Sequence, residues 1–147
     1  MSEPAPLFNQ FNLVVQDMEA TLRFYRRLGL TISDTDPAWA KHHRAALQAN
    51  GVELEFDSVE FAQQWDRGWP ARAAGGRGVL GFALASREAV DATYADLVAA
   101  GYKAQQAPYD AFWGARYAVV EDPDGNSVGL MSPADDAHRS APPAPPS

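Results

Sequence analysis

Amide and carboxylate side chains alternate with apolar residues along two short segments, and this spacing makes them candidates for binding chemistry. Gln10 and Asn12 lie in the first segment, and Glu53 and Glu55 in the second. In a β-strand, alternate side chains share one face, so both pairs are predicted to project away from a core. If they line a cleft, carboxylates without a bound metal suit a cationic or polyhydroxylated ligand. A solvent-exposed edge is the alternative position, above all for Glu53.

Aromatic side chains are concentrated near the second half of the chain, just before a predicted strand. Tyr109, Phe112, Trp113 and Tyr117 lie within nine residues. Tyrosine and tryptophan offer flat apolar area with a polar group, and they stack on planar or cationic groups. Tyr109, Phe112 and Trp113 are therefore predicted to bind a ligand, although Trp113 could instead fill space between structural modules. Arg116 is predicted either to pair with a ligand anion or to bridge to the carboxylate of Glu121 or Asp122.

Histidines are few, and their positions are poorly suited to a catalytic triad. The chain contains His42, His43 and His138. His42 and His43 are adjacent, so on a strand they would face opposite ways and one of them would be free to line a cleft. There is no cysteine, which excludes a disulfide framework, a thiolate nucleophile and a thiolate metal site. No Ser–His–Asp arrangement is indicated.

Composition predicts an ordinary folded domain rather than a disordered or membrane-spanning chain. Hydrophobic residues make up 46% and charged residues 21% of the 147 residues. The net charge of −7 opposes binding to nucleic acid. No apolar run reaches the ~18 residues that a membrane span needs. The first residues lack the basic and apolar regions of a signal peptide, so a cytoplasmic location is expected.

Two similar halves are predicted from the order of helix, strand and turn signals. A shift of 69 residues superposes Asp17 on Ser86 and Tyr25 on Tyr94, which places two helices in register. Each helix follows an alternating strand, and each is followed by three further strand signals. The predicted order is therefore β-α-β-β-β, twice. In the first half, the predicted segments are a strand at 11–15, a helix at 18–28 and strands at 30–33, 44–48 and 52–56.

Two motifs resemble those of the vicinal oxygen chelate superfamily, which includes glyoxalase I, extradiol dioxygenases and bleomycin-resistance proteins. One is the strand and helix of residues 13–30, whose helix ends in Phe-Tyr-x-x-Leu-Gly, and the other is Asp-Pro-Asp-Gly-Asn at 122–126. The resemblance implies an α+β fold of two tandem βαβββ modules that form a cupped mixed sheet. It covers a single domain at 8–133, with module one at about 8–57 and module two at about 79–132. Composition predicts a disordered tail at 134–147.

The resemblance also implies where a divalent metal would bind in the enzymes of this superfamily. The four ligand positions correspond here to Gln10, to Glu55, to Val79 or Phe82, and to Gly129. Neither Val79 nor Phe82 has a donor atom, and Gly129 has no side chain. Because a metal site depends on ligand number and geometry, no metal and no cofactor are predicted.

The leading prediction is therefore a metal-independent protein that binds a small molecule, similar to bleomycin-resistance-type proteins that sequester a drug or metabolite. It is expected to be a homodimer with no nucleic-acid or membrane partner. The predicted ligand-binding residues are Trp113, Arg116, Tyr109, Phe112, Gln10, Asn12 and Glu55.

Two enzyme hypotheses stay open beside this prediction, and no catalytic residue is assigned. The first is a glyoxalase-like lyase or isomerase, or a dioxygenase, with an incomplete metal site formed by Gln10, Glu55 and either His42 or His43. The second is a metal-free enzyme in which Glu55 or Glu53 acts as a general base in a buried cup.

Overall fold

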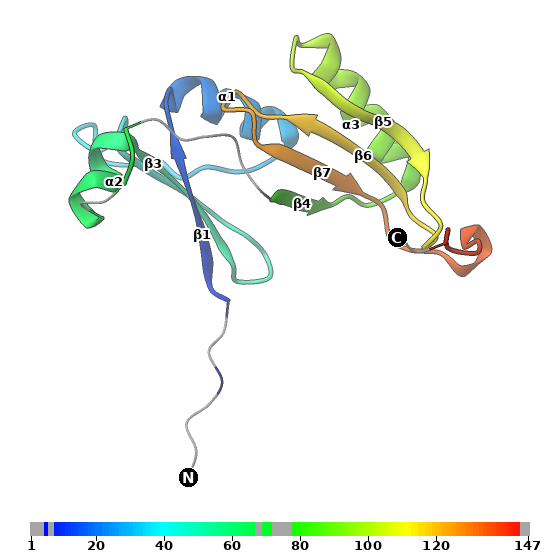
Figure 1. Ribbon diagram of the computed structural model, residues 1–147. Coiled ribbons are helices and arrows are strands. Elements are labelled where there is room, and N and C mark those ends of the chain that lie inside the picture. Colours follow the sequence, from blue (N-terminus) through cyan, green and yellow to red (C-terminus); the bar gives the residue numbers. More distant parts are fainter. Residues whose placement is uncertain (1–4, 6–7, 67–68, 72–77, 145–147) are drawn as a thin grey trace. The chain divides into compact units, whose positions relative to one another are not determined.

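A computed structural model describes residues 5, 8–66, 69–71 and 78–144, and the chain divides into two compact units. Unit 1 is Met1–Ala73 and unit 2 is Ala74–Ser147. Each unit has its own sheet and a helix that follows its first strand (Figure 1). Among the described residues, no helix is long and apolar enough to cross a membrane.

Unit 1 contains three strands and two helices. They are β1 (Gln10–Val15), α1 (Met18–Leu28), β2 (His43–Leu47), β3 (Glu53–Ser58) and α2 (Val59–Trp65). The sheet has the order β1-β3-β2, with β1 parallel and β2 antiparallel to β3. The predicted strand at 30–33 is wrong, because only isolated hydrogen bonds link this segment to β2, such as Ser33 N–H to the carbonyl of Ala45. The short helix α2 follows β3 directly.

Helix α1 begins and ends where the sequence predicts. The Asp17 carboxylate accepts a hydrogen bond from the backbone N–H of Ala20 at 3.1 Å, which satisfies a free donor of the first turn. Gly29 ends the helix with φ of 120°, a conformation that other residues rarely adopt. The buried ring of Tyr25 packs 5.1 Å from that of Phe56 on β3. Helix α1 therefore covers the apolar face of the sheet.

The predicted core face of β1 is only partly confirmed. Leu13 and Val15 are buried, whereas Phe11 is 44% exposed. Alternation therefore predicts correctly that Phe11 lies on the same face as Leu13 and Val15. It does not predict that this face is exposed at the beginning of the strand.

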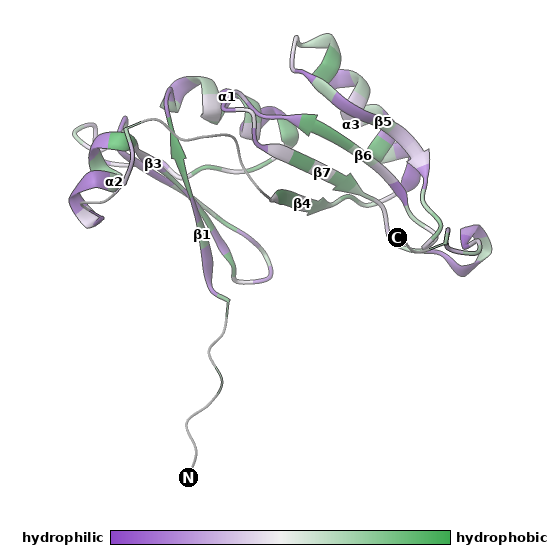
Figure 2. Cartoon of the chain, viewed as in Figure 1, coloured by the Kyte–Doolittle hydropathy of each residue, from purple (hydrophilic) through white to green (hydrophobic). Residues whose placement is uncertain are grey.

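Unit 2 repeats this plan with a fourth strand. It contains β4 (Val79–Ala83), α3 (Arg87–Ala99), β5 (Ala104–Asp110), β6 (Arg116–Glu121) and β7 (Ser127–Met131). The sheet order is β4-β7-β6-β5, and β4 runs parallel to β7 as β1 does to β3. Helix α3 lies along β5 and β6, and the apolar colouring of β6 and β7 marks this core (Figure 2).

The Asp-Pro-Asp-Gly-Asn motif forms the turn between β6 and β7. Both carboxylate oxygens of Asp122 accept hydrogen bonds inside the turn, from the backbone N–H groups of Asp124 and Asn126 and from the Asn126 side chain. Gly125 has φ of 82°, which explains why glycine is suited to this position.

The C-terminal segment, for which composition predicts disorder, makes main-chain contacts with the loop before β6. Residues Asp136–His138 form a 3₁₀ turn. The backbone N–H of Asp135 donates to the carbonyl of Gly114 at 3.1 Å, and that of Ser140 donates to the carbonyl of Phe112 at 2.9 Å. Composition predicts disorder because the segment lacks large apolar side chains, but here main-chain hydrogen bonds hold it. Residues 145–147 lie outside the described part of the chain.

Gly114 is the residue on which this docking depends most directly. Its φ is 95°, and a Cβ atom there would collide with the carbonyl oxygen of Asp135. Gly114→Ala should lower the free energy of unfolding of unit 2 by about 1–2 kcal/mol, from the strained backbone alone. Chemical denaturation measures this effect, and faster exchange of the Ser140 amide proton would report release of the segment.

Gly81→Ala provides the matched control for this prediction. Gly81 lies on β4 with an ordinary φ, and an added Cβ would meet nothing within 4 Å. The free energy of unfolding of the Gly81→Ala variant should stay within about 0.5 kcal/mol of that of the unsubstituted protein. Equal effects of the two substitutions would contradict the assigned role of Gly114.

Candidate functional site

The polar face of the unit 1 sheet brings together residues from all three strands. In the strand register, Asn12 on β1 lies opposite Glu55 on β3, and His43 on β2 lies opposite Asp57 on β3. Because paired positions share a face, these four side chains form one group on one side of the sheet. Gln10 joins it, and its side-chain amide donates to the Asn12 side chain at 2.9 Å. We call Asn12, His43, Glu55 and Asp57 the polar cluster.

Asp57 is the buried centre of the polar cluster. It is fully buried, and its two carboxylate oxygens have different partners. Oδ2 accepts a hydrogen bond from Asn12 Nδ2 at 2.9 Å, and Oδ1 lies 2.6 Å from His43 Nδ1. Sequence reasoning missed Asp57 because it ended this strand at residue 56. The signal was present, since Glu53, Glu55 and Asp57 continue the same period of two.

His43, rather than His42, belongs to the site, which resolves an alternative that the sequence left open. The two imidazoles point to different partners, as their adjacency on a strand predicts. His42 Nδ1 lies 2.9 Å from the Ser58 hydroxyl, away from the polar cluster. An ionised carboxylate only accepts hydrogen bonds, so His43 Nδ1 carries the proton that Asp57 binds. His43 Nε2 is then directed toward Glu55, at 3.7 Å from its Oε1.

Glu55 is the residue of the cluster with a perturbed acidity. Burial raises the pKa of its carboxyl above the ordinary value of 4.5, and a hydrogen bond with Glu53 raises it further. His43 opposes these effects by attracting the ionised carboxylate. Asn12 Nδ2 lies 3.3 Å from Glu55 Oε1, so the amide is shared between Glu55 and Asp57. Glu55 therefore faces the cleft with only partial compensation for its charge.

A cavity of about 360 Å³ opens beside this cluster. Its size lies near the lower limit for a site that binds a small organic molecule. The lining combines polar groups from the sheet with aromatic rings from α2. The lining residues are Gln10, Asn12, His43, Glu55, Asp57, Phe61 and Trp65. Three of the predicted ligand-binding residues therefore lie together in this cavity.

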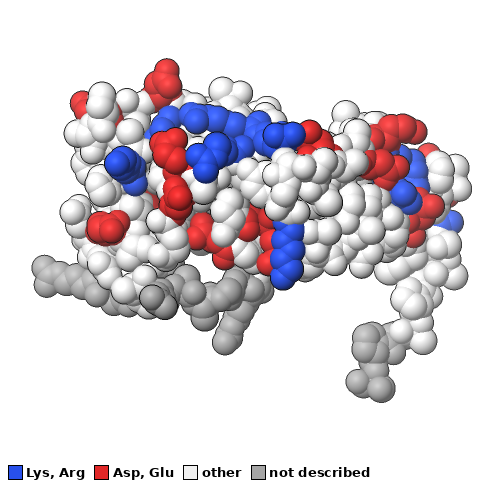
Figure 3. All heavy atoms as spheres, turned by 90° about the horizontal axis from the view of Figure 1, so that it is seen from above, with Lys and Arg blue, Asp and Glu red and all other residues white. Residues whose placement is uncertain are grey.

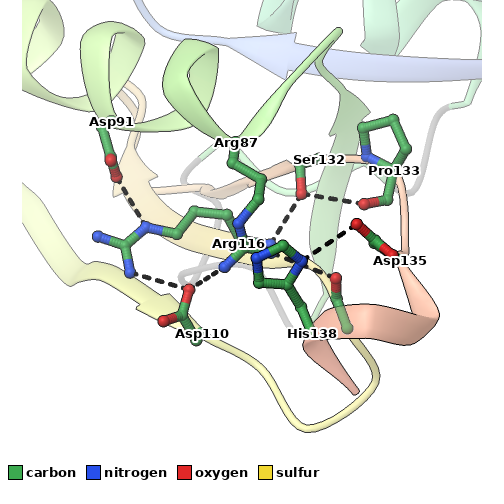
Figure 4. Close-up of polar contacts among 9 residues, drawn as sticks. Arg87, Asp91, Asp110, Arg116, Ser132, Pro133, Asp135 and His138 are labelled. Carbon is green, nitrogen blue, oxygen red and sulfur yellow. Dashed lines mark hydrogen bonds and ion pairs between the residues drawn. The ribbon is translucent and has the colours of Figure 1, made fainter.

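The predicted role of Arg116 as a ligand-binding residue finds no support in its contacts. Its Nε donates to Asp91 at 2.9 Å and its Nη1 donates to Asp110 at 3.2 Å (Figure 4). Arg87 also pairs with Asp110. The hydrogen bond with Asp91 is the largest contribution that raises the pKa of Arg116. The guanidinium thus joins α3, β5 and β6 within unit 2, with partners other than the expected Glu121 or Asp122.

The aromatic residues of unit 2 form a connected group. The ring of Tyr117 lies 6.1 Å from that of Tyr109 and 5.9 Å from that of Trp113, and the Phe112 ring lies 5.2 Å from Trp113. All three contacts are edge-to-face. Tyr109 belongs to β5, which extends to Asp110, rather than to a loop before β6. Tyr109 and Phe112 are 38% and 39% exposed, so part of this group faces solvent.

The donors present do not fit the metal site that the superfamily resemblance implies. At the fourth position, a Cβ on Gly129 would lie 2.8 Å from the Tyr117 hydroxyl, so the phenol fills the space of a ligand side chain. In unit 1, Asp57 and His43 Nδ1 bind each other, which leaves His43 Nε2 and Glu55 as the available histidine and carboxylate donors. Catalytic zinc sites use three protein ligands. Within the described residues, no group of three or more histidine or acidic side chains is arranged to hold a metal ion.

Charges of both signs are distributed over the visible surface rather than separated. Figure 3 shows Lys and Arg side chains next to Asp and Glu side chains on the face viewed from above. This mixture gives no broad field of one sign on that face. Recognition must therefore come from local groups such as the polar cluster.

We predict that Asp57→Ala strongly destabilises unit 1. It removes a buried acceptor and leaves the Asn12 amide and the His43 N–H without their partner. Loss of a buried charged hydrogen-bond partner costs about 2–3 kcal/mol. Urea denaturation would measure the change. Glu60→Ala, at an exposed position on α2, is the control and should change stability by less than about 0.5 kcal/mol.

We also predict that Glu55→Gln stabilises the protein at neutral pH. A raised pKa means that the folded state binds the proton more tightly than the unfolded state does. The stability of the unsubstituted protein therefore falls as pH rises from about 4.5 through the raised pKa of Glu55. The neutral amide lacks this loss, so the advantage of the variant should grow from acidic to neutral pH. Thermal unfolding at several pH values tests this, and a difference independent of pH would contradict it.

Comparison with known proteins places these features in a family. The family model of the glyoxalase/bleomycin resistance protein/dioxygenase superfamily matches residues 7–130. A search of curated proteins finds no match.

Solved structures share the fold at low sequence identity. A glyoxalase-related enzyme from Fulvimarina pelagi is 24% identical, with a TM-score of 0.74 over 88% of this chain and 89% of that one. A family member from Burkholderia phytofirmans is 22% identical, with a TM-score of 0.73 over 85% and 97%. A lactoylglutathione lyase from Agrobacterium tumefaciens is 20% identical, with a TM-score of 0.64 over 88% and 96%.

These matches confirm the predicted α+β fold of two βαβββ modules, of which the first lacks the strand predicted at 30–33. The chain belongs to the glyoxalase/bleomycin resistance protein/dioxygenase superfamily, also called the vicinal oxygen chelate superfamily.

Proposed function

We propose that this protein binds a small molecule in the unit 1 cavity without a resident metal ion, as bleomycin-resistance-type members of its superfamily do. One observation carries the proposal: buried Asp57 fixes Asn12 and His43 on either side of a partly exposed Glu55, beside an open cavity. Side chains held in this way present their polar atoms in a fixed arrangement, which lowers the entropy cost of binding.

The chemical variety of the lining supports binding of an organic molecule. Gln10 and Asn12 supply amide groups, and Glu55 supplies an acceptor with a negative charge. Phe61 and Trp65 supply apolar area on α2. Sites for small molecules typically combine mostly apolar walls with a few well-placed polar groups.

The aromatic group of unit 2 remains part of the proposal as a stacking surface formed by Tyr109, Phe112 and Trp113. Arg116 is removed from the set of ligand-binding residues because Asp91 and Asp110 bind its guanidinium. We retain the homodimer as a further element of the proposal.

A metal-free enzyme is the second candidate function, and one feature favours it. Glu55 combines a raised pKa with an imidazole nitrogen 3.7 Å away, a pairing typical of groups that exchange protons. A glyoxalase-like metal enzyme has less support, because two of the four ligand positions that the superfamily implies have no donor atom here, and the described residues hold no group of three or more histidine or acidic side chains arranged for a metal ion. If Glu55 is a general base, turnover should survive a chelator and depend on Glu55.

The experiment that tests the proposal is a ligand screen by NMR in the presence of a chelator. We expect members of a mixed set of cationic, neutral and anionic compounds to shift the amide signals of Asn12, His43 and Glu55. Asn12→Ala should weaken such binding about fivefold to tenfold, the effect of losing one hydrogen bond. Glu60→Ala is the control and should leave affinity unchanged.

Two results would contradict the proposal. One is a set of compounds that shifts no signal of the cavity. The other is near-stoichiometric nickel, zinc, iron or manganese, measured by elemental mass spectrometry on protein purified without a metal-affinity tag. Such metal content would favour the metal-enzyme hypothesis instead.

Trp113→Ala separately tests the stacking surface of unit 2. Loss of a stacked ring should weaken binding of an aromatic ligand by about tenfold, while the fold remains intact. Unchanged affinity in a titration of this variant would remove Trp113 from the site.

A further inference from the structure

We infer that the ligand of the unit 1 cavity is an organic ammonium ion, held between the Glu55 carboxylate and the aromatic rings of Phe61 and Trp65. This inference rests on the proposed binding function and specifies the class of ligand. It combines three independent features of the cavity: its charge, its aromatic wall and its volume.

The charge of the lining favours a cation. Glu55 and Asp57 are the acidic lining residues, and none of the described lining residues is Lys or Arg. His43 is the nearest basic group, but its Nδ1–H is directed to Asp57. Asp57 is buried and has two partners, so Glu55 is the carboxylate left to face a ligand. An anion placed here would meet a negative charge without a compensating donor.

The aromatic wall adds an attraction that is specific for organic cations. Phe61 is fixed by edge-to-face contacts with Trp39 at 5.1 Å and His43 at 5.5 Å. Trp65 is 47% exposed and packs against Trp69 at 5.7 Å. Aromatic faces attract ammonium groups within about 6 Å of the ring centroid. The rings also bury the methyl groups of an alkylated ammonium away from water, which adds a favourable hydrophobic contribution. A hydrated metal ion has no apolar groups and gains no such contribution.

The volume of the cavity separates an organic cation from a bare metal ion. At about 360 Å³ the cavity is far larger than a metal ion, and among the histidine and carboxylate groups of its described lining His43 Nε2 and Glu55 are the donors that remain available. An alkylated ammonium fills such a space with apolar groups while it leaves one charge against Glu55. The same residues thus disfavour a metal and favour an organic cation.

The experiment compares choline with 3,3-dimethylbutan-1-ol, which has the same shape but no charge. Titrations followed by NMR on the full chain, in the presence of a chelator, give both affinities. We expect choline to bind about tenfold more tightly, from one partly shielded ion pair and the cation–π contacts. Equal affinities, or tighter binding of the alcohol, would overturn the inference while leaving the binding function in place.

Matched variants test which side chains are responsible. Glu55→Gln keeps the shape and removes the charge, so it should reduce choline affinity to about that of the alcohol. Glu60→Gln removes one charge from α2 at a residue outside this cavity and should leave choline affinity unchanged. Trp65→Leu should reduce choline affinity about threefold to tenfold and reduce that of the alcohol less. Retained choline selectivity in Glu55→Gln would overturn the inference.

The same titrations distinguish failure of this inference from failure of the proposed function. If neutral or anionic members of the screening set shift the Asn12 and Glu55 signals and choline does not, the cavity binds ligands but not this class. If no compound shifts these signals, both the inference and the proposed function fail.

Discussion

The buried carboxylate of Asp57 is the interaction on which the candidate site depends. It lies on the central strand β3 and binds a side chain from each neighbouring strand, Asn12 on β1 and His43 on β2. A buried carboxylate is costly unless its oxygens are paired, so this position enforces both contacts. The result is a polar face that is fixed across the whole sheet of unit 1. Glu55, two residues earlier, is thereby placed between groups that cannot easily move.

The two units show how one strand order supports different surfaces. In both, the first strand runs parallel to the last, which brings the ends of each module together. In unit 1 the metal-ligand positions that the superfamily implies carry Gln10 and Glu55, whereas in unit 2 they carry Val79 or Phe82, and Gly129. Because Gly129 has no side chain, the Tyr117 ring occupies the space above it. Unit 2 thus repeats the fold of unit 1 but not the donor atoms of the metal site that the superfamily implies. Membership of the superfamily therefore does not by itself imply the metal chemistry of its enzymes.

The sequence predicts the fold and part of the site from patterns between residues that are close together in the chain. Alternation assigns Asn12 and Glu55 to one face, and adjacency assigns His42 and His43 to opposite faces. Adjacency cannot decide which of the two histidines enters the site, because that depends on how β2 pairs with β3, which lies further along the chain. Arg116 shows the same limit. Its partners Asp91 and Asp110 lie on α3 and β5, and the packing of these elements against β6 brings them to the guanidinium.

In the proposed metal-free function, selectivity comes from side-chain charge and shape, and the two act on the same ligand atoms. A resident ion would attract anionic or oxygen-rich groups, whereas Glu55 in the same position attracts positive charge. The aromatic residues of α2 then matter more than in a metal site, because they discriminate between an alkylated cation and a hydrated one. Helix α2 has this role because it begins directly after β3, at the Ser58 cap. A single strand-to-helix junction therefore places the carboxylate wall and the aromatic wall of the cavity within ten residues of each other, from Glu55 to Trp65.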